Sequence, residues 1–361
     1  MSDRRPLLFT RFPALEGQLG FEPLADRLPT PVEPLPGLAD RWGIGQLWVK
    51  RDDLTSSVYG GNKVRKLEWI LGAAKRAGRR AVITTGAWGS HHALATALFA
   101  RAVGLRATLV LFPQPPTAHV RDNYLLDVGA GARISRAASV ATVPLALARG
   151  RLAARFAGEG WPYGVVAGGS DRHGTLGYVE AGLELAAQVA ARALPVPDYV
   201  YVAAGTCGTA AGLALGLTLA SAELPELAAT RVVAVRVVPG VLANQRRIRA
   251  LIGRATALLG AAGAGLPAPL APLPVALVTD QVGRGYGHAT GAAEQARADA
   301  AELDQLEVDT TYTAKALAGL RAYASAADRR DGVHLYVHTL GVSPPIPSLD
   351  EKILPRSLRN L

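Results

Sequence analysis

Lys63 is the residue of this sequence whose type and setting most clearly suggest covalent chemistry. It follows Gly60-Gly61-Asn62 and opens a stretch, residues 64–71, whose apolar residues recur at helical spacing. The two glycines allow a positive φ and a close approach of the backbone to a ligand. The chain has six lysines against 33 arginines, and a lysine amine, unlike a guanidinium, can lose its proton and form an imine. We therefore expect a reactive amine at the start of a helix, with a surface lysine as the alternative.

A glycine-rich loop farther along the chain has the composition of an anion site. It lies between an apolar run, residues 199–204, which predicts a buried strand, and a helical run, residues 210–219. Backbone N–H groups of such a loop bind phosphate with the helix dipole behind them, and hydroxyls can add donors. The candidate phosphate ligands are Gly205, Thr206, Cys207, Gly208 and Thr209. A nucleotide site is the alternative, although the loop has neither G-x-x-x-x-G-K-[ST] nor G-x-G-x-x-G.

Three further segments place polar or aromatic residues after predicted strands. Ser90, His91 and His92 follow the strand 81–85 and precede a helical run, residues 93–103. Tyr286 and Tyr312 lie late in the chain, and His338-Thr339-Leu340-Gly341 follows the strand 333–337. The strands 81–85 and 106–112 alternate with helical runs, which predicts a parallel α/β sheet. For a lone tyrosine, core packing is the usual explanation.

The motifs together resemble one enzyme family. K-R-D-D-L at residues 50–54 and G-G-N-K-x-R-K-L-E at residues 60–68 are similar to the lysine segment of the D-cysteine desulfhydrase and 1-aminocyclopropane-1-carboxylate (ACC) deaminase family. The segments around Tyr286, Tyr312 and His338 resemble its later motifs in order and spacing. The resemblance covers nearly the whole chain. It implies the tryptophan-synthase-β-like fold, which is fold type II of the pyridoxal-phosphate enzymes, an α/β fold of two domains whose parallel sheets carry helices on both faces.

The resemblance also implies roles for individual residues. Lys63 would form the imine with pyridoxal 5′-phosphate and transfer protons, next to Asn62, and residues 205–209 would hold the phosphate. Ser90, His91 and His92 would lie near the cofactor ring and the substrate carboxylate, and Tyr286 and Tyr312 would flank the substrate. The ring nitrogen would lie near Thr339, with Thr313 as a second candidate. The implied reaction is removal of the Cα proton, loss of a β leaving group such as hydrosulfide, and hydrolysis to pyruvate and ammonia.

The motifs depart from the family pattern at three positions. His91 stands where the family has asparagine, and Cys207 and Leu340 stand where it has glycine. Thr313 and Thr339 resemble the desulfhydrase branch, because ACC deaminases carry glutamate after the second tyrosine. A lyase acting on a bulkier or differently charged amino acid, an ACC deaminase, and a member without activity remain alternatives. Across classes, the alternatives are a nucleotide-dependent enzyme and a non-catalytic binding protein.

Composition limits the other classes of function. The chain has 361 residues, a formal net charge of +10 and a single cysteine, which suits the reducing cytoplasm. Its arginines are scattered, so we expect no nucleic-acid partner. Two long uncharged stretches, residues 199–222 and 255–279, contain glycines or prolines that argue against a membrane span. We also expect no metal site, a small amino-acid substrate and a homodimer.

The predicted domains follow the family pattern. Residues 1–57 and 174–361 would form the large cofactor-binding domain. Residues 58–173 would form the small domain, which carries Lys63 and the loop of Ser90 to His92.

Overall fold

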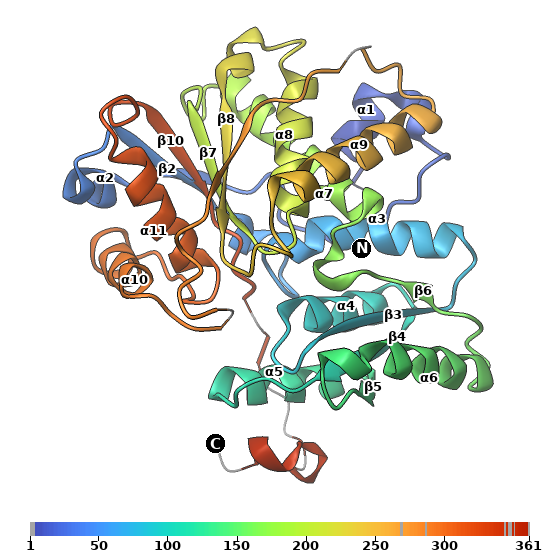
Figure 1. Ribbon diagram of the computed structural model, residues 1–361. Coiled ribbons are helices and arrows are strands. Elements are labelled where there is room, and N and C mark those ends of the chain that lie inside the picture. Colours follow the sequence, from blue (N-terminus) through green and yellow to red (C-terminus); the bar gives the residue numbers. More distant parts are fainter. Residues whose placement is uncertain are drawn as a thin grey trace.

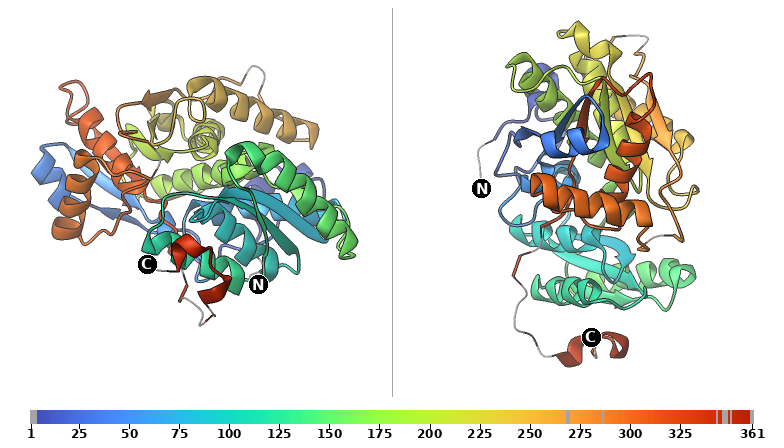
Figure 2. Two further views of the ribbon diagram at one scale, coloured as in Figure 1. Left: turned by 60° about the horizontal axis from the view of Figure 1, so that its bottom comes forward. Right: turned by 90° about the vertical axis from the view of Figure 1, so that its left-hand side faces the viewer.

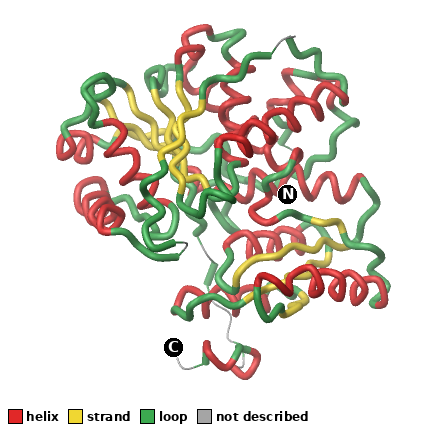
Figure 3. The backbone as a smooth tube through the Cα atoms, viewed as in Figure 1, coloured by secondary structure: helices red, strands yellow, loops and turns green. Residues whose placement is uncertain are grey.

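The structure is a computed structural model that describes residues 4–267, 270–285, 287–342, 344–345, 349 and 351–359. Tyr286 therefore lies outside the described residues. The described chain forms two separate sheets with helices packed around them (Figures 1 and 3).

The larger sheet has six strands in the order β1-β2-β10-β7-β8-β9. All neighbours are parallel except β1, which runs antiparallel to β2. Its strands are β1 (Val32–Pro34), β2 (Gln46–Lys50), β7 (Tyr199–Ala204), β8 (Arg231–Arg236), β9 (Val275–Val278) and β10 (Val333–Val337). The predicted strands 199–204 and 333–337 are confirmed to the residue.

The smaller sheet has four parallel strands in the order β5-β4-β3-β6. They are β3 (Ala81–Ala87), β4 (Arg106–Phe112), β5 (Arg133–Arg136) and β6 (Tyr163–Gly164). The predicted strand 106–112 is confirmed, and the parallel arrangement agrees with the alternation of strands and helical runs.

The helices connect and cover these strands. The α-helices of the described residues are α1 (Leu7–Arg11), α2 (Pro36–Trp42), α3 (Asn62–Arg76), α4 (His91–Ala102), α5 (Ala118–Gly129), α6 (Val143–Phe156), α7 (Arg172–Ala190), α8 (Gly208–Ala220), α9 (Gln245–Ala261), α10 (Gly291–Asp304) and α11 (Thr313–Ala324). In Figure 1, α7, α8 and α9 lie on one side of the larger sheet, whereas α2, α10 and α11 lie on the other. Figure 2 gives two further views of this arrangement.

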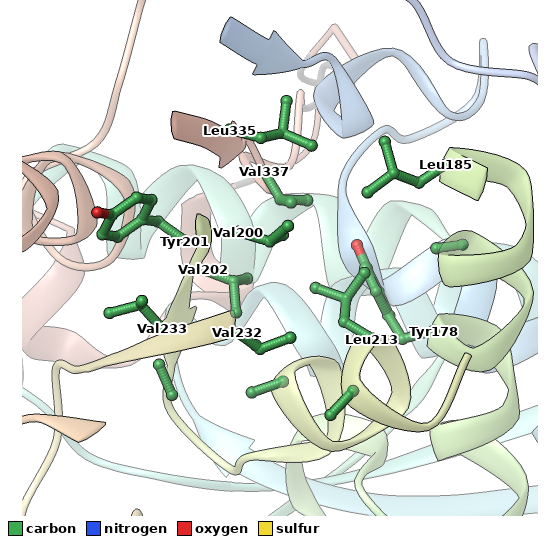
Figure 4. Packing of buried hydrophobic residues seen from close by; sticks show 14 of the residues in the cluster. Tyr178, Leu185, Val200, Tyr201, Val202, Leu213, Val232, Val233, Leu335 and Val337 are labelled. Atoms are coloured by element: carbon green, nitrogen blue, oxygen red, sulfur yellow. The ribbon is translucent and has the colours of Figure 1, made fainter. Parts of the chain in front are cut away.

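The largest apolar cluster lies between the larger sheet and its helices. Val200, Val202 and Val232 pack with Tyr178 and Leu213, which come from α7 and α8 (Figure 4). Both faces of the central strands are buried, so their sequences read as continuous apolar runs.

In the smaller sheet, the two faces pack against different helices. Ile83 and Val110 belong to a cluster with Ala146 of α6. Val82 and Leu109, their strand neighbours, belong to a cluster with residues of α3, α4 and α5. This division follows from the alternation of side chains along a strand.

The C-terminal end of the chain returns to the smaller sheet. Leu354 and Leu358 are buried in the same cluster as Val82 and Leu109, and the segment lies below α5 in Figure 1. The large domain was predicted to include residues 174–361 and therefore this segment, which packs on the smaller sheet. No motif in the sequence distinguishes these residues.

A buried ion network fixes α3 against the larger sheet. Both terminal nitrogens of Arg65 donate to Glu184 at 2.9 Å, and its Nε donates to Asp52 at 3.1 Å. Lys50 Nζ donates to the same Glu184 at 2.6 Å. Because Arg65 is two residues from Lys63, this network sets the position of the helix that carries the reactive amine.

Candidate active site

A cavity of about 300 Å³ opens between the two sheets. Its walls come from the segments that follow β3, β4, β7, β8 and β10, together with the start of α3. Ligands of parallel α/β sheets bind at the carboxyl ends of strands. The cavity is therefore where this fold would be expected to bind a small molecule.

Lys63 faces this cavity from the first turn of α3. Gly61 precedes it with φ +89°, and a Cβ there would lie 2.7 Å from the carbonyl oxygen of Leu340, so only glycine fits. Lys63 Nζ donates to Asn62 Oδ1 at 2.7 Å, and Asn62 Nδ2 donates to Thr209 Oγ1 at 3.1 Å. Burial lowers the pKa of the Lys63 amine to about 8, whereas the Asp309 carboxylate acts to raise it. About a tenth of the amine is therefore unprotonated at pH 7, far more than for an ordinary lysine.

The predicted phosphate loop adjoins the start of α3 through the bond between Asn62 and Thr209. Helix α8 begins at Gly208, two residues earlier than predicted, and Cys207 is its N-cap with φ +69°. Ser170 Oγ accepts from the N–H of Gly208 at 3.2 Å and lies 2.6 Å from Thr206 Oγ1. A Cβ on Gly208 would lie 2.5 Å from Ser170 Oγ, so a side chain at this position would displace Ser170. The N-terminus of α8 thus offers N–H and hydroxyl groups to an anion.

Lys66 places a second amine beside this loop. Its Nζ donates to Ser170 Oγ at 3.2 Å and to the carbonyl of Gly168 at 3.3 Å, and it lines the cavity. Lys66 and Ser170 were not among the residues predicted for the site. The signal for Lys66 was its spacing of three residues from Lys63, which places both on one helix face.

The loop after β3 brings Ser90, His91 and His92 to the cavity. Ser90 caps α4 by accepting from the N–H of Ala93 at 3.2 Å. His91 Nδ1 lies 2.6 Å from the hydroxyl of Tyr59. His92 is buried, with Nε2 3.0 Å from Thr84 Oγ1. All three of Ser90, His91 and His92 line the cavity.

Of the described residues in the late motifs, some line the cavity and others do not. Tyr312, Thr339 and Leu340 line the cavity, and a Cβ on Gly205 would lie 3.3 Å from the Tyr312 ring. Thr313 is buried and donates to the Asp309 carboxylate at 2.6 Å, and it is not among the cavity-lining residues. Of the two candidates for the ring nitrogen, only Thr339 therefore faces the cavity.

These residues fit a molecule that carries both an aldehyde and a phosphate. A buried amine of lowered pKa suits imine formation, and a helix N-terminus with the adjacent Lys66 amine suits a dianion, whose charge would favour the protonated form of that amine. The described residues contain no group of three histidine, cysteine or acidic side chains that could hold a metal ion. No helix in the described part of the chain is long and apolar enough to cross a membrane.

Comparisons with known proteins agree with the geometry. The family model described as "Pyridoxal-phosphate dependent enzyme" matches residues 25–339, so the chain belongs to that family and its cofactor is pyridoxal phosphate. Within the family, a D-cysteine desulfhydrase of Salmonella paratyphi B is 35% identical over 345 residues, 92% of this chain and 95% of the relative. Nocardicin C-9′ epimerase of Nocardia uniformis subsp. tsuyamanensis is 38% identical over 320 residues, 86% of this chain and 90% of the relative.

A solved structure of an ACC deaminase homologue supports the same assignment. It has a TM-score of 0.75 and 32% identity, and the match covers 93% of this chain and 95% of that chain. The predicted fold type and cofactor are confirmed, and the protein is an enzyme. The nucleotide-dependent and non-catalytic alternatives are set aside.

Proposed function

We propose that the protein is a pyridoxal-phosphate-dependent lyase that carries out α,β-elimination on an amino acid, as a D-cysteine desulfhydrase does. The observation that carries the proposal is the Lys63 amine, whose pKa is lowered to about 8 in a cavity that also holds an anion site. The desulfhydrase relatives support it, as does Thr313, a threonine at the position where ACC deaminases carry glutamate.

When bound, the cofactor supplies an electron sink at the substrate Cα. Lys63 would hold it covalently and take the Cα proton, while Thr206, Gly208 and Lys66 would bind its phosphate. Ser90 and Tyr312, both lining the cavity, would bind the substrate carboxylate and assist departure of the β group. Tyr286 was predicted beside Tyr312 and lies outside the described residues.

Epimerisation is a second candidate, because the epimerase relative is 38% identical to this chain over 320 residues. Both reactions begin with loss of the Cα proton. In elimination the electron pair expels the β group, whereas in epimerisation a proton returns to the opposite face.

One experiment separates these outcomes. The holoenzyme is incubated in D₂O with D-cysteine, L-cysteine, β-chloro-D-alanine and ACC. Pyruvate is assayed for the cysteines and β-chloro-D-alanine and 2-oxobutyrate for ACC, and recovered amino acid is analysed for deuterium and for configuration. We expect pyruvate from the D-amino acids at a higher rate than 2-oxobutyrate from ACC. Inverted, deuterated amino acid without pyruvate would establish epimerisation instead, and faster turnover of ACC would establish the deaminase.

Three further proposals rest on the resemblance. We infer a homodimer in the cytoplasm. We also propose domain boundaries near residues 57 and 173, with the C-terminal segment of Leu354 and Leu358 attached to the small domain. Analytical ultracentrifugation tests the dimer.

A further inference from the structure

The exposed large apolar side chains of the described residues gather mainly at two places. One is helix α6 and its flanks, with Val140, Leu145, Leu152, Phe156 and Trp161. The other is the active-site cavity: Leu242 lines it, and Val58, Val166, Val241 and Val342 are each the chain neighbour of a lining residue. Exposed apolar side chains that gather beside a pocket are available to contact a ligand bound there.

The second group continues into the cavity wall. Phe112 at the end of β4, Val238 and Leu242 after β8, and Leu340 after β10 all line it. These side chains lie at or after the ends of three strands, so the apolar part of the cavity lining comes from both sheets. Leu340 and Leu242 carry isobutyl groups, and Leu242 is 46% exposed although it lines the cavity.

The cavity wall carries apolar side chains in addition to the polar groups of the amine and anion sites. The polar lining residues around Lys63, Lys66 and Thr206 already provide the amine and the anion site. Hydrosulfide, the leaving group of cysteine, is small and strongly hydrated, so it offers little apolar surface to side chains such as Phe112, Leu242 and Leu340. Burial of apolar surface is favourable in proportion to its area.

We propose that the substrate carries a bulky apolar group on its β-sulfur, as in an S-alkyl or S-benzyl cysteine. This inference rests on the proposed elimination and names its substrate class. The Cα–H and Cβ–S bonds break, a C=C bond forms, and the thiolate leaves and takes up a proton. Water then hydrolyses the resulting enamine, through its imine, to pyruvate and ammonia. The sum is R–S–CH₂–CH(NH₂)–COOH + H₂O giving pyruvate, ammonia and RSH, and no oxidant or reductant is consumed.

The kinetic test is a substrate series in both configurations: cysteine, S-methyl-, S-propyl- and S-benzylcysteine. Pyruvate and thiol are measured for the holoenzyme. We expect kcat/KM to rise along the series, by roughly fourfold per methylene that becomes fully buried. Leu242→Ser should lower the ratio of S-benzylcysteine to cysteine kcat/KM about tenfold. Leu152→Ser is the matched control, because Leu152 is 47% exposed on α6, and it should leave the ratio unchanged.

A binding measurement separates failure of the inference from failure of the proposed reaction. Alanine, norleucine and phenylalanine have no β leaving group, and their dissociation constants follow from the change in visible absorption of the holoenzyme. Tighter binding with larger side chains, lost in Leu242→Ser, supports the apolar subsite even if no pyruvate ever forms. The inference would be overturned if cysteine is eliminated but neither kcat/KM nor binding affinity increases with the size of the side chain. The exposed apolar side chains beside the cavity would then be covered by something other than substrate.

Discussion

The hydroxyl of Tyr59 lies 2.6 Å from Nδ1 of His91. Burial raises the pKa of the Tyr59 phenol, so the phenol keeps its proton and donates. Burial and the neighbouring His119 lower the pKa of His91 to about 4. The imidazole is therefore neutral, accepts at Nδ1 and carries its proton on Nε2. An imidazole fixed in this tautomer offers one N–H to the cavity, where the family has the amide of asparagine.

Replacing Tyr59 by Phe should remove the hydrogen bond that fixes the tautomer of His91. We expect ring ¹⁵N NMR of His91, assigned with a His91→Asn variant, to change from a single Nε2–H form to a mixture. Cofactor affinity should fall about fivefold, the value of one hydrogen bond of ~1 kcal/mol. In a His91→Asn background, Tyr59→Phe should have no effect on affinity, because an amide has no tautomer to fix. An equal loss in both backgrounds would mean that Tyr59 acts only through packing.

The lowered pKa of Lys63 predicts how covalent cofactor attachment depends on pH. Only the neutral amine attacks an aldehyde, so the rate of attachment to stripped protein should rise through pH 8 and then level, well below the ordinary lysine value of about 10.4. Asp309→Asn removes a carboxylate that raises the pKa, and the midpoint should move lower. Borohydride reduction and peptide mapping should find the label on Lys63. A label on Lys66, which shares the cavity, would reverse the assignment.

At Cys207 we expect the glycine variant to be more stable than the alanine variant, the reverse of the order inside a helix. Its φ of +69° lies in the left-handed region, which costs a residue with a Cβ about 1–2 kcal/mol. Cys207→Ala keeps this strain, whereas Cys207→Gly removes it. The glycine variant should therefore be about 1 kcal/mol more stable than the alanine variant in urea unfolding. At Ala211, inside α8 with helical φ, the Ala→Gly change should destabilise by a similar amount. A Cys207→Gly variant less stable than Cys207→Ala would exclude strain as the dominant effect.

Asp127 should make stability fall as pH rises. It is buried in α5, and neither carboxylate oxygen has a hydrogen-bond partner among the described residues. Burial raises its pKa, so the folded state holds the neutral acid while the unfolded state ionises above about pH 4. Each proton released on unfolding favours the unfolded state as pH increases. Asp127→Asn should therefore stabilise the protein at pH 8 and have little effect at pH 4.

Asp122 provides the control for this measurement. It lies in the same helix, partly exposed and 3.4 Å from Arg121. Asp122→Asn should change stability little and by a similar amount at both pH values. If Asp127→Asn shows the same flat response, the carboxyl of Asp127 is solvated or paired in solution.

The fold and part of the site could be predicted from the sequence for a physical reason. Strands such as 199–204 are buried on both faces, and their apolar runs end at glycine. The local sequence therefore marks where such a strand begins and ends. Lys63 is likewise marked by its neighbours Gly61 and Asn62. Ser170 and Asp309 were missed because their relation to Lys63 arises from tertiary packing across both sheets. Thr313 was predicted as a possible cofactor contact, but its hydroxyl donates to Asp309. The spacing of four residues allows that bond, and the sequence alone could not show whether the hydroxyl would make it or face the cavity.

The scarcity of lysine has a practical consequence for handling the protein. Lys50, Lys66 and Lys315 are buried and Lys63 lines the cavity, whereas only Lys75 and Lys352 have substantially exposed side chains among the six. Amine-directed crosslinkers, dyes and solid supports should thus attach at two lysine side chains. Lys75 lies in the last turn of α3 and Lys352 lies near the C-terminus, so immobilisation through these two side chains should present the molecule in a small number of defined orientations.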